Sequence, residues 1–372
     1  MTSVRRVVAV AGLACLLAAC GNGSSTAPRS GSGSVMPATG PSSPTDTRSP
    51  VGSPDHPVVL QPAHSPLDWQ PVPGTTKDLV TVGNGWTLTV SAGGGSARLT
   101  GPHPRTVPAG PHSRITDAFL DGPHALIVSE DRFAQAPDRA VVVDLASGRA
   151  TTLDRTSSPP TVVGGTWALG PDTVLHATRG PGHSYCVATV DLTTGTGSSG
   201  WCAQPRHGFS TAAVTEDGTS MMIFDDHHPS CRTLVDVSGD QLTPIAGVAP
   251  CNGWDSARLG STTIWSVTPN ERQIEAAHFY AHTGTGWYDL GRGTSGSLVT
   301  GDGSAYCTRD PGSRTDPATL LRWSPDTSSL SVAFASKGTG NAFLAPPRCG
   351  GTHLTVTAYE QAGDQQVTTS LG

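Results

Sequence analysis

Short runs of alternating apolar and polar residues, each followed by a tight turn, recur along most of the chain. The clearest pair of matching stretches is Leu169–Cys202 and Ala213–Cys251. In each stretch a turn joins two alternating runs. A cysteine then opens a third run and lies five residues before an aspartate, as Cys186 does before Asp191. Alternation over short runs predicts β-strands, and the shared register indicates one structural unit used twice.

The same hairpin signal occurs seven times. The predicted turns centre on Gly85, Gly122, Gly170, Gly218, Gly260, Gly303 and Gly351. The intervals between these glycines are 37, 48, 48, 42, 43 and 48 residues. Intervals of this length, each with about four short strands, are typical of propeller blades. The sequence therefore predicts an all-β fold, a seven-bladed β-propeller with four-stranded blades. Two packed β-sandwiches are the alternative arrangement.

The predicted last blade lacks one strand. Its strands are expected near Phe343, over 353–359 and over 366–370, and no fourth strand follows them. The segment His56–Pro62 is apolar and has no other partner. We expect this segment to complete the last blade and close the ring, because closure removes an exposed sheet edge. The predicted propeller accordingly spans residues 56–372.

The N-terminal region has the pattern of an export signal. Arg5 and Arg6 precede the apolar run Val7–Leu16, which is too short to span a bilayer as a mature helix. The following residues, Leu17–Gly21, resemble the lipobox of bacterial lipoprotein signals. The resemblance implies that residues 1–19 are removed and that Cys20 receives a diacylglyceryl group. The alternative is an ordinary secretory signal that contains a cysteine by chance.

Residues 20–55 are predicted to be a disordered linker after the lipidated cysteine. Gly, Ser, Pro and Thr dominate Gly21–Ser53, and few apolar side chains are present to form a core. With the lipid anchor, this linker predicts a cell-membrane location on the extracytoplasmic side. The linker would hold the propeller away from the membrane surface.

Six cysteines remain in the predicted propeller, and an even number in an exported chain predicts disulfides. Fifteen pairings of six cysteines are possible. Cysteines that bracket equivalent hairpins are expected to pair, and the remaining two are assigned by elimination. The predicted pairs are Cys186 with Cys202, Cys231 with Cys251, and Cys307 with Cys349.

Composition narrows the function classes. The net charge of −6 provides no basic surface for nucleic acid. Charged residues make up only 14% of the chain, and 45 glycines and 31 prolines favour turns over helices. We expect a monomer, with no cofactor predicted and a divalent metal possible.

The densest set of potential metal ligands is Asp225, Asp226, His227 and His228, in the connection between the second and third strands of blade four. Carboxylates and imidazoles suit divalent metals. However, neighbouring residues of an extended loop point in different directions, so a site would need ligands from other blades. A solvated polar loop explains the same residues.

Equivalent connections in several blades are long, polar and rich in arginine. Arginine is suited to bidentate recognition of carboxylate or sulfate groups, and loops on a rigid scaffold commonly carry binding sites. The candidate ligand-binding residues are Arg132, Arg139, Arg179, Arg272 and Arg309. Surface solvation is the alternative role for these side chains.

Other motifs do not indicate an enzyme. The GxGxxG match Gly291–Gly296 precedes a predicted strand rather than a helix, so we expect an inter-blade loop. No GxSxG or HExxH motif occurs, and no catalytic residue is assigned. Seven of the eight tryptophans are expected to pack between blades rather than to stack on sugars. They are Trp86, Trp167, Trp201, Trp254, Trp265, Trp287 and Trp323.

Residues 56–372 resemble TolB-like and related bacterial propellers, and the whole chain resembles an actinobacterial surface lipoprotein. This resemblance implies a fold and a location but brings no catalytic residues with it. The predicted function is a membrane-anchored binding or scaffold lipoprotein. Its ligand, an unknown protein or an envelope glycan, would meet the face that carries the connections between second and third strands. The alternative is a metal-assisted hydrolase or lyase that acts at the channel with His227 and His228. A purely structural role is the third interpretation.

Overall fold

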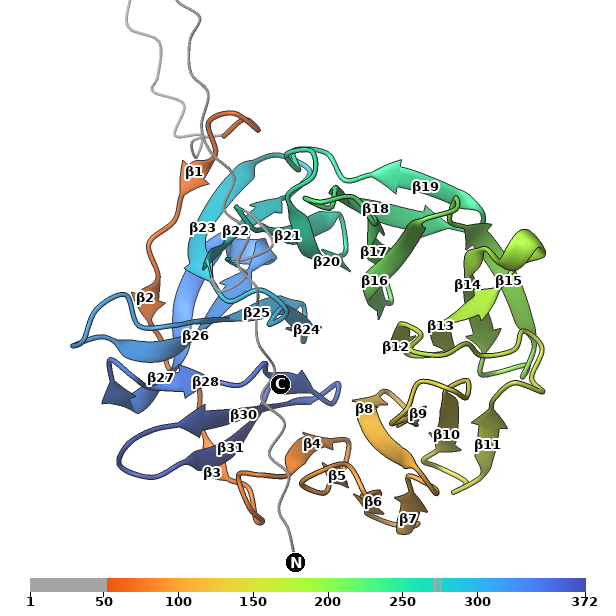
Figure 1. The fold of residues 1–372 in the computed structure, drawn as a ribbon. Helices are drawn as coiled ribbons and strands as arrows, with labels where there is room; N and C mark the ends of the chain where they lie inside the picture. Colours follow the sequence, from red (N-terminus) through yellow and green to blue (C-terminus); the bar gives the residue numbers. More distant parts are fainter. Residues whose placement is uncertain (1–51, 270–272, 274–275) are drawn as a thin grey trace, which may run out of the picture. The chain divides into compact units, whose positions relative to one another are not determined.

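Seven sheets, each built on consecutive antiparallel strands, stand side by side around a central axis (Figure 1). This computed structural model describes residues 52–269, 273 and 276–372. The predicted seven-bladed propeller is confirmed, and the alternative of two packed sandwiches is wrong. The predicted signal peptide, Cys20 and nearly all of the predicted linker lie outside the described residues.

Each of the first four blades consists of four consecutive strands, ordered from the axis outward. Blade one contains β4 (Leu79–Gly83), β5 (Trp86–Val90), β6 (Ser96–Thr100) and β7 (Arg105–Pro108). Blade two contains β8 (Ser113–Asp121), β9 (His124–Asp131), β10 (Arg139–Asp144) and β11 (Ala150–Leu153). Blade three contains β12 (Trp167–Leu169), β13 (Thr173–Arg179), β14 (Tyr185–Asp191) and β15 (Gly197–Cys202). Blade four contains β16 (His207–Thr215), β17 (Gly218–Asp225), β18 (Arg232–Ser238) and β19 (Gln241–Pro244).

The last three blades also recruit strands from the N-terminal side of blade one. Blade five contains β20 (Gly253–Leu259), β21 (Thr262–Val267), β22 (Ala277–His282), β23 (Trp287–Gly293) and β1 (Val58–Val59). Blade six contains β24 (Val299–Gly301), β25 (Ser304–Arg309), β26 (Pro317–Ser324), β27 (Ser329–Thr339) and β2 (Ala63–His64). Blade seven contains β28 (Phe343–Leu344), β29 (Arg348–Cys349), β30 (His353–Tyr359), β31 (Gln365–Ser370) and β3 (Gln70–Pro71).

The seven predicted turns all lie between the first two main strands of a blade. Six of the seven glycines have a positive φ, which a residue with a Cβ rarely adopts. Gly170 has a different role, because a Cβ at this position would lie 2.4 Å from Cγ1 of Val214 in the next blade. Its glycine permits close packing of blades three and four.

The core lies between the blades, because alternate residues of each strand face opposite neighbours. In β25, for example, Tyr306 packs with residues of blade seven, and Cys307 packs with residues of blade five. Trp86, Trp167 and Trp323 are buried in clusters of this kind, as the sequence predicts.

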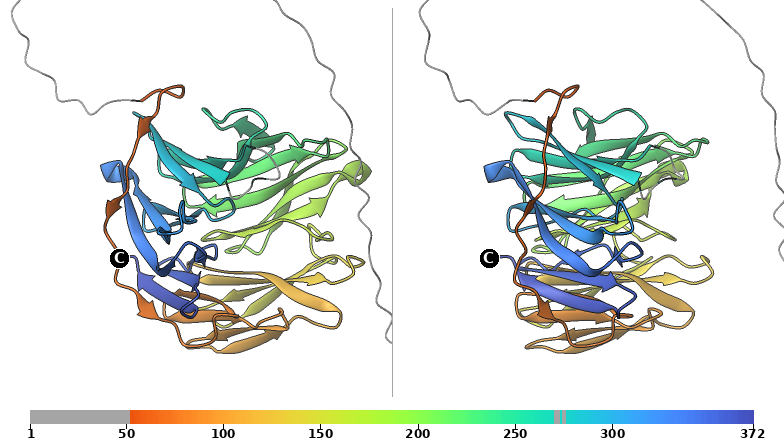
Figure 2. Two further views of the ribbon diagram at one scale, coloured as in Figure 1. Left: turned by 60° about the vertical axis from the view of Figure 1, so that its left-hand side comes forward. Right: turned by 90° about the vertical axis from the view of Figure 1, so that its left-hand side faces the viewer.

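The segment before blade one forms a strap along the outer edges of blades five, six and seven (Figures 1 and 2). We use "strap" for residues 52–71. Its strands β1 and β2 pair in parallel with β23 and β27, and β3 pairs antiparallel with β31. The prediction that His56–Pro62 completes the last blade is therefore wrong, although an N-terminal strand does close the ring.

Two physical features explain this shift. Blade one begins at Leu79, so the strand that leads into it from the edge of blade seven must lie only a few residues earlier. The outermost strand of a blade also faces solvent, and Gln70 and Pro71 are both exposed. Apolarity was thus the wrong criterion for the closing strand.

Two of the three predicted disulfides are present, Cys186–Cys202 and Cys231–Cys251. Cys186 in β14 bonds to Cys202 at the end of β15. Cys231, just before β18, bonds to Cys251 in the loop that follows β19. Disulfides of this kind indicate an oxidising, extracytoplasmic environment. Among the described residues, no helix is long and apolar enough to cross a membrane.

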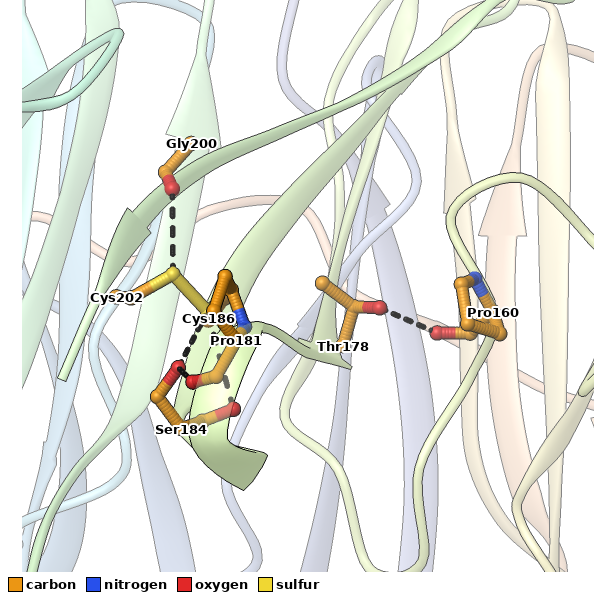
Figure 3. The surroundings of a disulfide bond; sticks show 7 residues. All are labelled: Pro160, Thr178, Pro181, Ser184, Cys186, Gly200 and Cys202. Atoms are coloured by element: carbon orange, nitrogen blue, oxygen red, sulfur yellow. Dashed lines mark hydrogen bonds between the residues drawn. A yellow bond between two sulfur atoms is a disulfide. The ribbon is translucent and has the colours of Figure 1, made fainter. Parts of the chain in front are cut away.

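The first disulfide lies in a locally bonded corner of blade three (Figure 3). Ser184 Oγ donates a hydrogen bond to the Pro181 carbonyl oxygen (2.9 Å) and lies 3.4 Å from Cys186 Sγ. A Cβ at Gly180 would lie 2.3 Å from Cys186 Sγ. The disulfide therefore packs closely against the connection that contains the short 3-10 helix η1 (Pro181–His183).

The third predicted disulfide, Cys307–Cys349, is wrong, because both cysteines are free. Cys307 packs in the cluster between blades five and six, whereas Cys349 packs against the cluster between blades six and seven. The sheet of blade six separates the two thiols. Assignment by elimination did not take account of the face to which each side chain points.

Thiol labelling tests this correction. Burial raises the pKa of Cys307 to about 12 and that of Cys349 to about 11, so neither thiol is expected to react at pH 8 in the folded protein. After denaturation of residues 52–372 without reductant, mass spectrometry should find alkylation at these two cysteines and at none of the other four. If Cys307 and Cys349 remained unalkylated in the denatured chain, the third disulfide would be present after all.

Candidate functional site

The four candidate arginines that the structure describes lie on one face of the propeller, in three different blades. Consecutive strands of a blade run antiparallel, so the connection between the second and third strands lies at the same end of the ring in every blade. Arg132 and Arg139 belong to blade two, Arg179 to blade three and Arg309 to blade six. Arg272 lies outside the described residues. The structure therefore does not gather these side chains into one site.

Of these arginines, Arg309 lines a cavity of about 730 Å³ between blades five and six, together with Arg292 and His64. Two carboxylates, Asp310 and Asp316, line the same cavity, so its charge is mixed. Arg309 Nε also donates to Thr319 Oγ1 (3.3 Å). This surface offers no clear preference for an anion.

Of the four potential metal ligands of blade four, His227 and Asp225 face each other, with His227 Nδ1 3.1 Å from Asp225 Oδ2. Asp226 pairs with Arg206 at 2.8 Å, and Asp225 accepts hydrogen bonds from the backbone N–H groups of His227 and Cys231. No group of three or more histidine, cysteine or acidic side chains suited to a metal occurs in the described part of the chain. The loop geometry therefore gives no support to a metal site at Asp225–His228.

At the opposite end of the channel, the turns between the first and second strands of the blades converge. A cavity of about 470 Å³ opens there among the inner strands of blades two to seven. We call it the channel mouth. Most of its wall is apolar: Phe119, Leu120, Ala168, Leu169, Ala212, Ala213, Val214, Ala257, Leu259, Leu298 and Val299.

Four carboxylates line the channel mouth: Asp121, Glu216, Asp217 and Asp302. Asp217 Oδ2 already accepts a hydrogen bond from the Gly260 N–H (2.6 Å). By contrast, Glu216 and Asp302 have no hydrogen bond or ion pair with any described residue. The mouth therefore combines apolar walls with negative charge that is free to meet a ligand.

Asp121 has a strongly shifted pKa. Burial raises its pKa to about 6, and the negative charge of Glu216 acts in the same direction. The Gly122 N–H and His124 oppose this shift. A carboxyl group of this kind, in a cavity and beside a second carboxylate, is a typical feature of functional sites. It also changes charge within an accessible pH range.

Hydrogen bonds between neighbouring turns hold the rim in place. Thr352 Oγ1 of blade seven donates to Asn84 Oδ1 of blade one (2.9 Å), and Asn84 Nδ2 donates to the Gly122 carbonyl oxygen of blade two (3.0 Å). The His124 ring and the Pro171 carbonyl oxygen, 3.0 Å apart, connect blades two and three. A rim fixed in this way can present its carboxylates without reorganising.

The sequence did not predict this site, because the acidic residues of the site were interpreted only as parts of turns. Asp121, Glu216 and Asp302 each lie immediately beside or within two residues of a predicted turn glycine. That shared register was an available signal. Their convergence follows only from ring closure, which places turns of different blades around one axis.

The first half of the glycine-rich match, Gly291–Gly293, ends β23, so only the second half lies in the inter-blade loop that the sequence predicts for the whole motif. The Gly296 N–H donates to Asp255 Oδ2 (2.6 Å), and the Ser266 hydroxyl also contacts this oxygen (3.3 Å). Asp255 belongs to the inner strand of blade five, so the contact joins blades five and six. Burial raises its pKa from 3.8 to about 6.

The comparisons with known proteins agree with this architecture. The β-propeller domain of the Trilobed protease from Pyrococcus furiosus is similar with a TM-score of 0.55 at 9% identity, over 79% of this chain and 94% of that chain. A prolyl endopeptidase structure is similar with a TM-score of 0.50 at 13% identity. That match covers 75% of this chain but only 44% of the endopeptidase chain.

No protein-family model matches the sequence, and no curated protein is significantly similar to it. At identities of 9% and 13% the structural similarity shows the shared fold alone. Propellers serve many functions, so activity must be argued from the site.

The buried Asp255 makes stability depend on pH. Its carboxyl stays protonated in the folded protein up to about pH 6 but ionises near 3.8 in the unfolded chain. Its stabilising contribution is therefore complete below pH 4 and is lost as the pH rises through 6, at most about 3 kcal/mol. Asp121 acts with the same sign.

Urea denaturation between pH 4 and 7.5 tests this effect with Asp255→Asn. The unfolding free energy of the variant should depend less steeply on pH than that of the wild type. The pH dependence that remains should come from Asp121. Asp326→Asn, which removes an exposed carboxylate, serves as the control. Equal slopes for wild type and Asp255→Asn would show that Asp255 is ionised in the folded protein.

Proposed function

We propose that this protein is an extracytoplasmic binding protein, tethered to the membrane by a lipid on Cys20. Its channel mouth captures a positively charged segment of a partner protein. The observation that carries this proposal is the apolar cavity on the propeller axis, whose rim carboxylates include two, Glu216 and Asp302, without a partner among the described residues. A lysine or arginine side chain matches this chemistry, since its stem is apolar and its head is cationic.

The charge distribution around the mouth supports a cationic ligand. Asp121, Glu216 and Asp302 come from three blades, and no Lys or Arg side chain lines the cavity. Arg258, which packs near the Gly218 turn, is already paired with Asp236. The negative charge at the mouth therefore remains available to attract a basic partner.

A hydrolase or lyase that acts at the channel is the second candidate. The feature that favours it is the pairing of Asp121, whose pKa is raised to about 6, with the nearby carboxylate of Glu216. Two carboxyl groups with different environments suit general acid and base roles. This candidate requires turnover, and a binding protein does not.

Calorimetric titration with a tetralysine peptide at pH 7.5 tests the binding proposal. The variant Glu216→Gln/Asp302→Asn should bind about tenfold more weakly, a loss of about 1.4 kcal/mol, because two attractive charges are removed. Neither carboxylate makes a hydrogen bond with a described residue, so the fold should be retained. Lowering the pH to 5 should also weaken binding, since Asp121 becomes protonated.

The matched control is Asp240→Asn/Asp326→Asn. These two exposed carboxylates lie on the same face, in the turns between third and fourth main strands at the periphery of blades four and six. The control should bind tetralysine as the wild type does. Equal weakening in both double variants would indicate only a general charge effect and contradict a site at the mouth. Hydrolysis or elimination products from envelope substrates would favour the second candidate.

A further inference from the structure

A third cavity, of about 560 Å³, lies between blades four and five at their outer edge, beneath the strap. We call it the strap cavity. Three parts of the chain line it. The strap contributes Pro54, Asp55 and Pro57, and the loop after β19 contributes Gly247, Val248 and Ala249. Blade five contributes Trp265, Val267, Tyr280, Trp287, Tyr288 and Asp289.

The aromatic side chains form a continuous wall. The Trp265 ring centroid lies 6.0 Å from that of Tyr280, with the rings 23° from parallel, and 5.9 Å from that of Trp287, at 77°. His282 stacks on Trp287 at 4.0 Å and supports it. Rings this close touch one another, so no cation fits between them as it would in an aromatic cage. The wall instead suits a flat ring laid against it.

The Tyr280 hydroxyl has no hydrogen-bond partner in the described part of the chain, and Tyr280 lines the cavity. Trp265 is only 2% exposed, and its Nε1–H also lacks a partner among the described residues. This N–H is closed to solvent, however, so it does not reach a ligand in the cavity. The Tyr280 hydroxyl is therefore the donor available to a ligand.

Acceptors are available beside this donor. Asp289 Oδ1 lies 2.5 Å from His278 Nε2 and accepts the Gly291 N–H (2.8 Å). Its other oxygen has no partner among the described residues. The Asp55 carboxylate of the strap is exposed and makes no hydrogen bond with them. No Lys or Arg side chain lines the strap cavity, which disfavours an anionic ligand.

We propose that the strap cavity binds a neutral sugar. Its pyranose ring lies against the aromatic wall, and its hydroxyl groups donate to the carboxylates of Asp55 and Asp289. The Tyr280 hydroxyl donates to a sugar oxygen. The strap thereby takes part in the site, because one acceptor belongs to it. This site is separate from the channel mouth and does not depend on the function proposed there.

The indole N–H signal of Trp265 in a ¹⁵N-labelled full-length protein provides a readout, with Trp265→Phe used to assign it. The probes are maltose, N,N′-diacetylchitobiose and choline. We expect a saturable shift of this signal with at least one disaccharide. Tyr280→Phe and Asp55→Asn should each raise the Kd about fivefold or more without lowering the Tm, and Asp326→Asn should have no effect.

Glu216→Gln/Asp302→Asn should leave sugar binding unchanged, so failure of the channel mouth and failure of the strap cavity are distinguishable. A shift with choline but with neither disaccharide would overturn the proposal, as would no saturable shift with any probe. Sugar binding that Tyr280→Phe and Asp55→Asn do not weaken would place the ligand elsewhere and would also overturn it.

Discussion

The pairing of β3 with β31 is the contact on which the ring depends. It joins a strand that precedes blade one to a strand of blade seven, through Gln70 opposite Thr368 and Pro71 opposite Val367. The Trp69 Nε1–H donates to the Ala333 carbonyl oxygen (2.8 Å), which fixes the strap on blade six just before this pairing. Without β3, blade seven would expose an unpaired edge.

Both proposed sites depend on this closure in different ways. The channel mouth takes residues from blades two to seven, and its rim includes the hydrogen bond from Thr352 of blade seven to Asn84 of blade one. An open ring would separate these turns. The strap cavity needs the strap itself, because Asp55 lies ahead of β1 on the same segment. One N-terminal segment thus closes the propeller and helps to form a candidate binding site.

Local patterns of the sequence predicted the local structure. The turn glycines gave the number of blades, and the register of Cys186 and Cys231 gave two correct disulfides. Predictions that depended on the direction of a side chain, or on contacts between distant parts of the chain, were less successful. The third disulfide failed because Cys307 and Cys349 lie on opposite sides of blade six, and the closing strand was misplaced because an edge strand need not be apolar. The carboxylates of the channel mouth meet only through the ring, which no local pattern encodes.

Hydrogen exchange in two shortened proteins tests ring closure most directly. One lacks residues 52–64 and so loses β1 and β2, and the other lacks residues 52–73 and also loses β3. Ring closure by β3 predicts that the backbone amides of β31 keep their protection in the first protein and lose it by roughly tenfold or more in the second. Equal protection of β31 in both proteins would contradict the central role of β3.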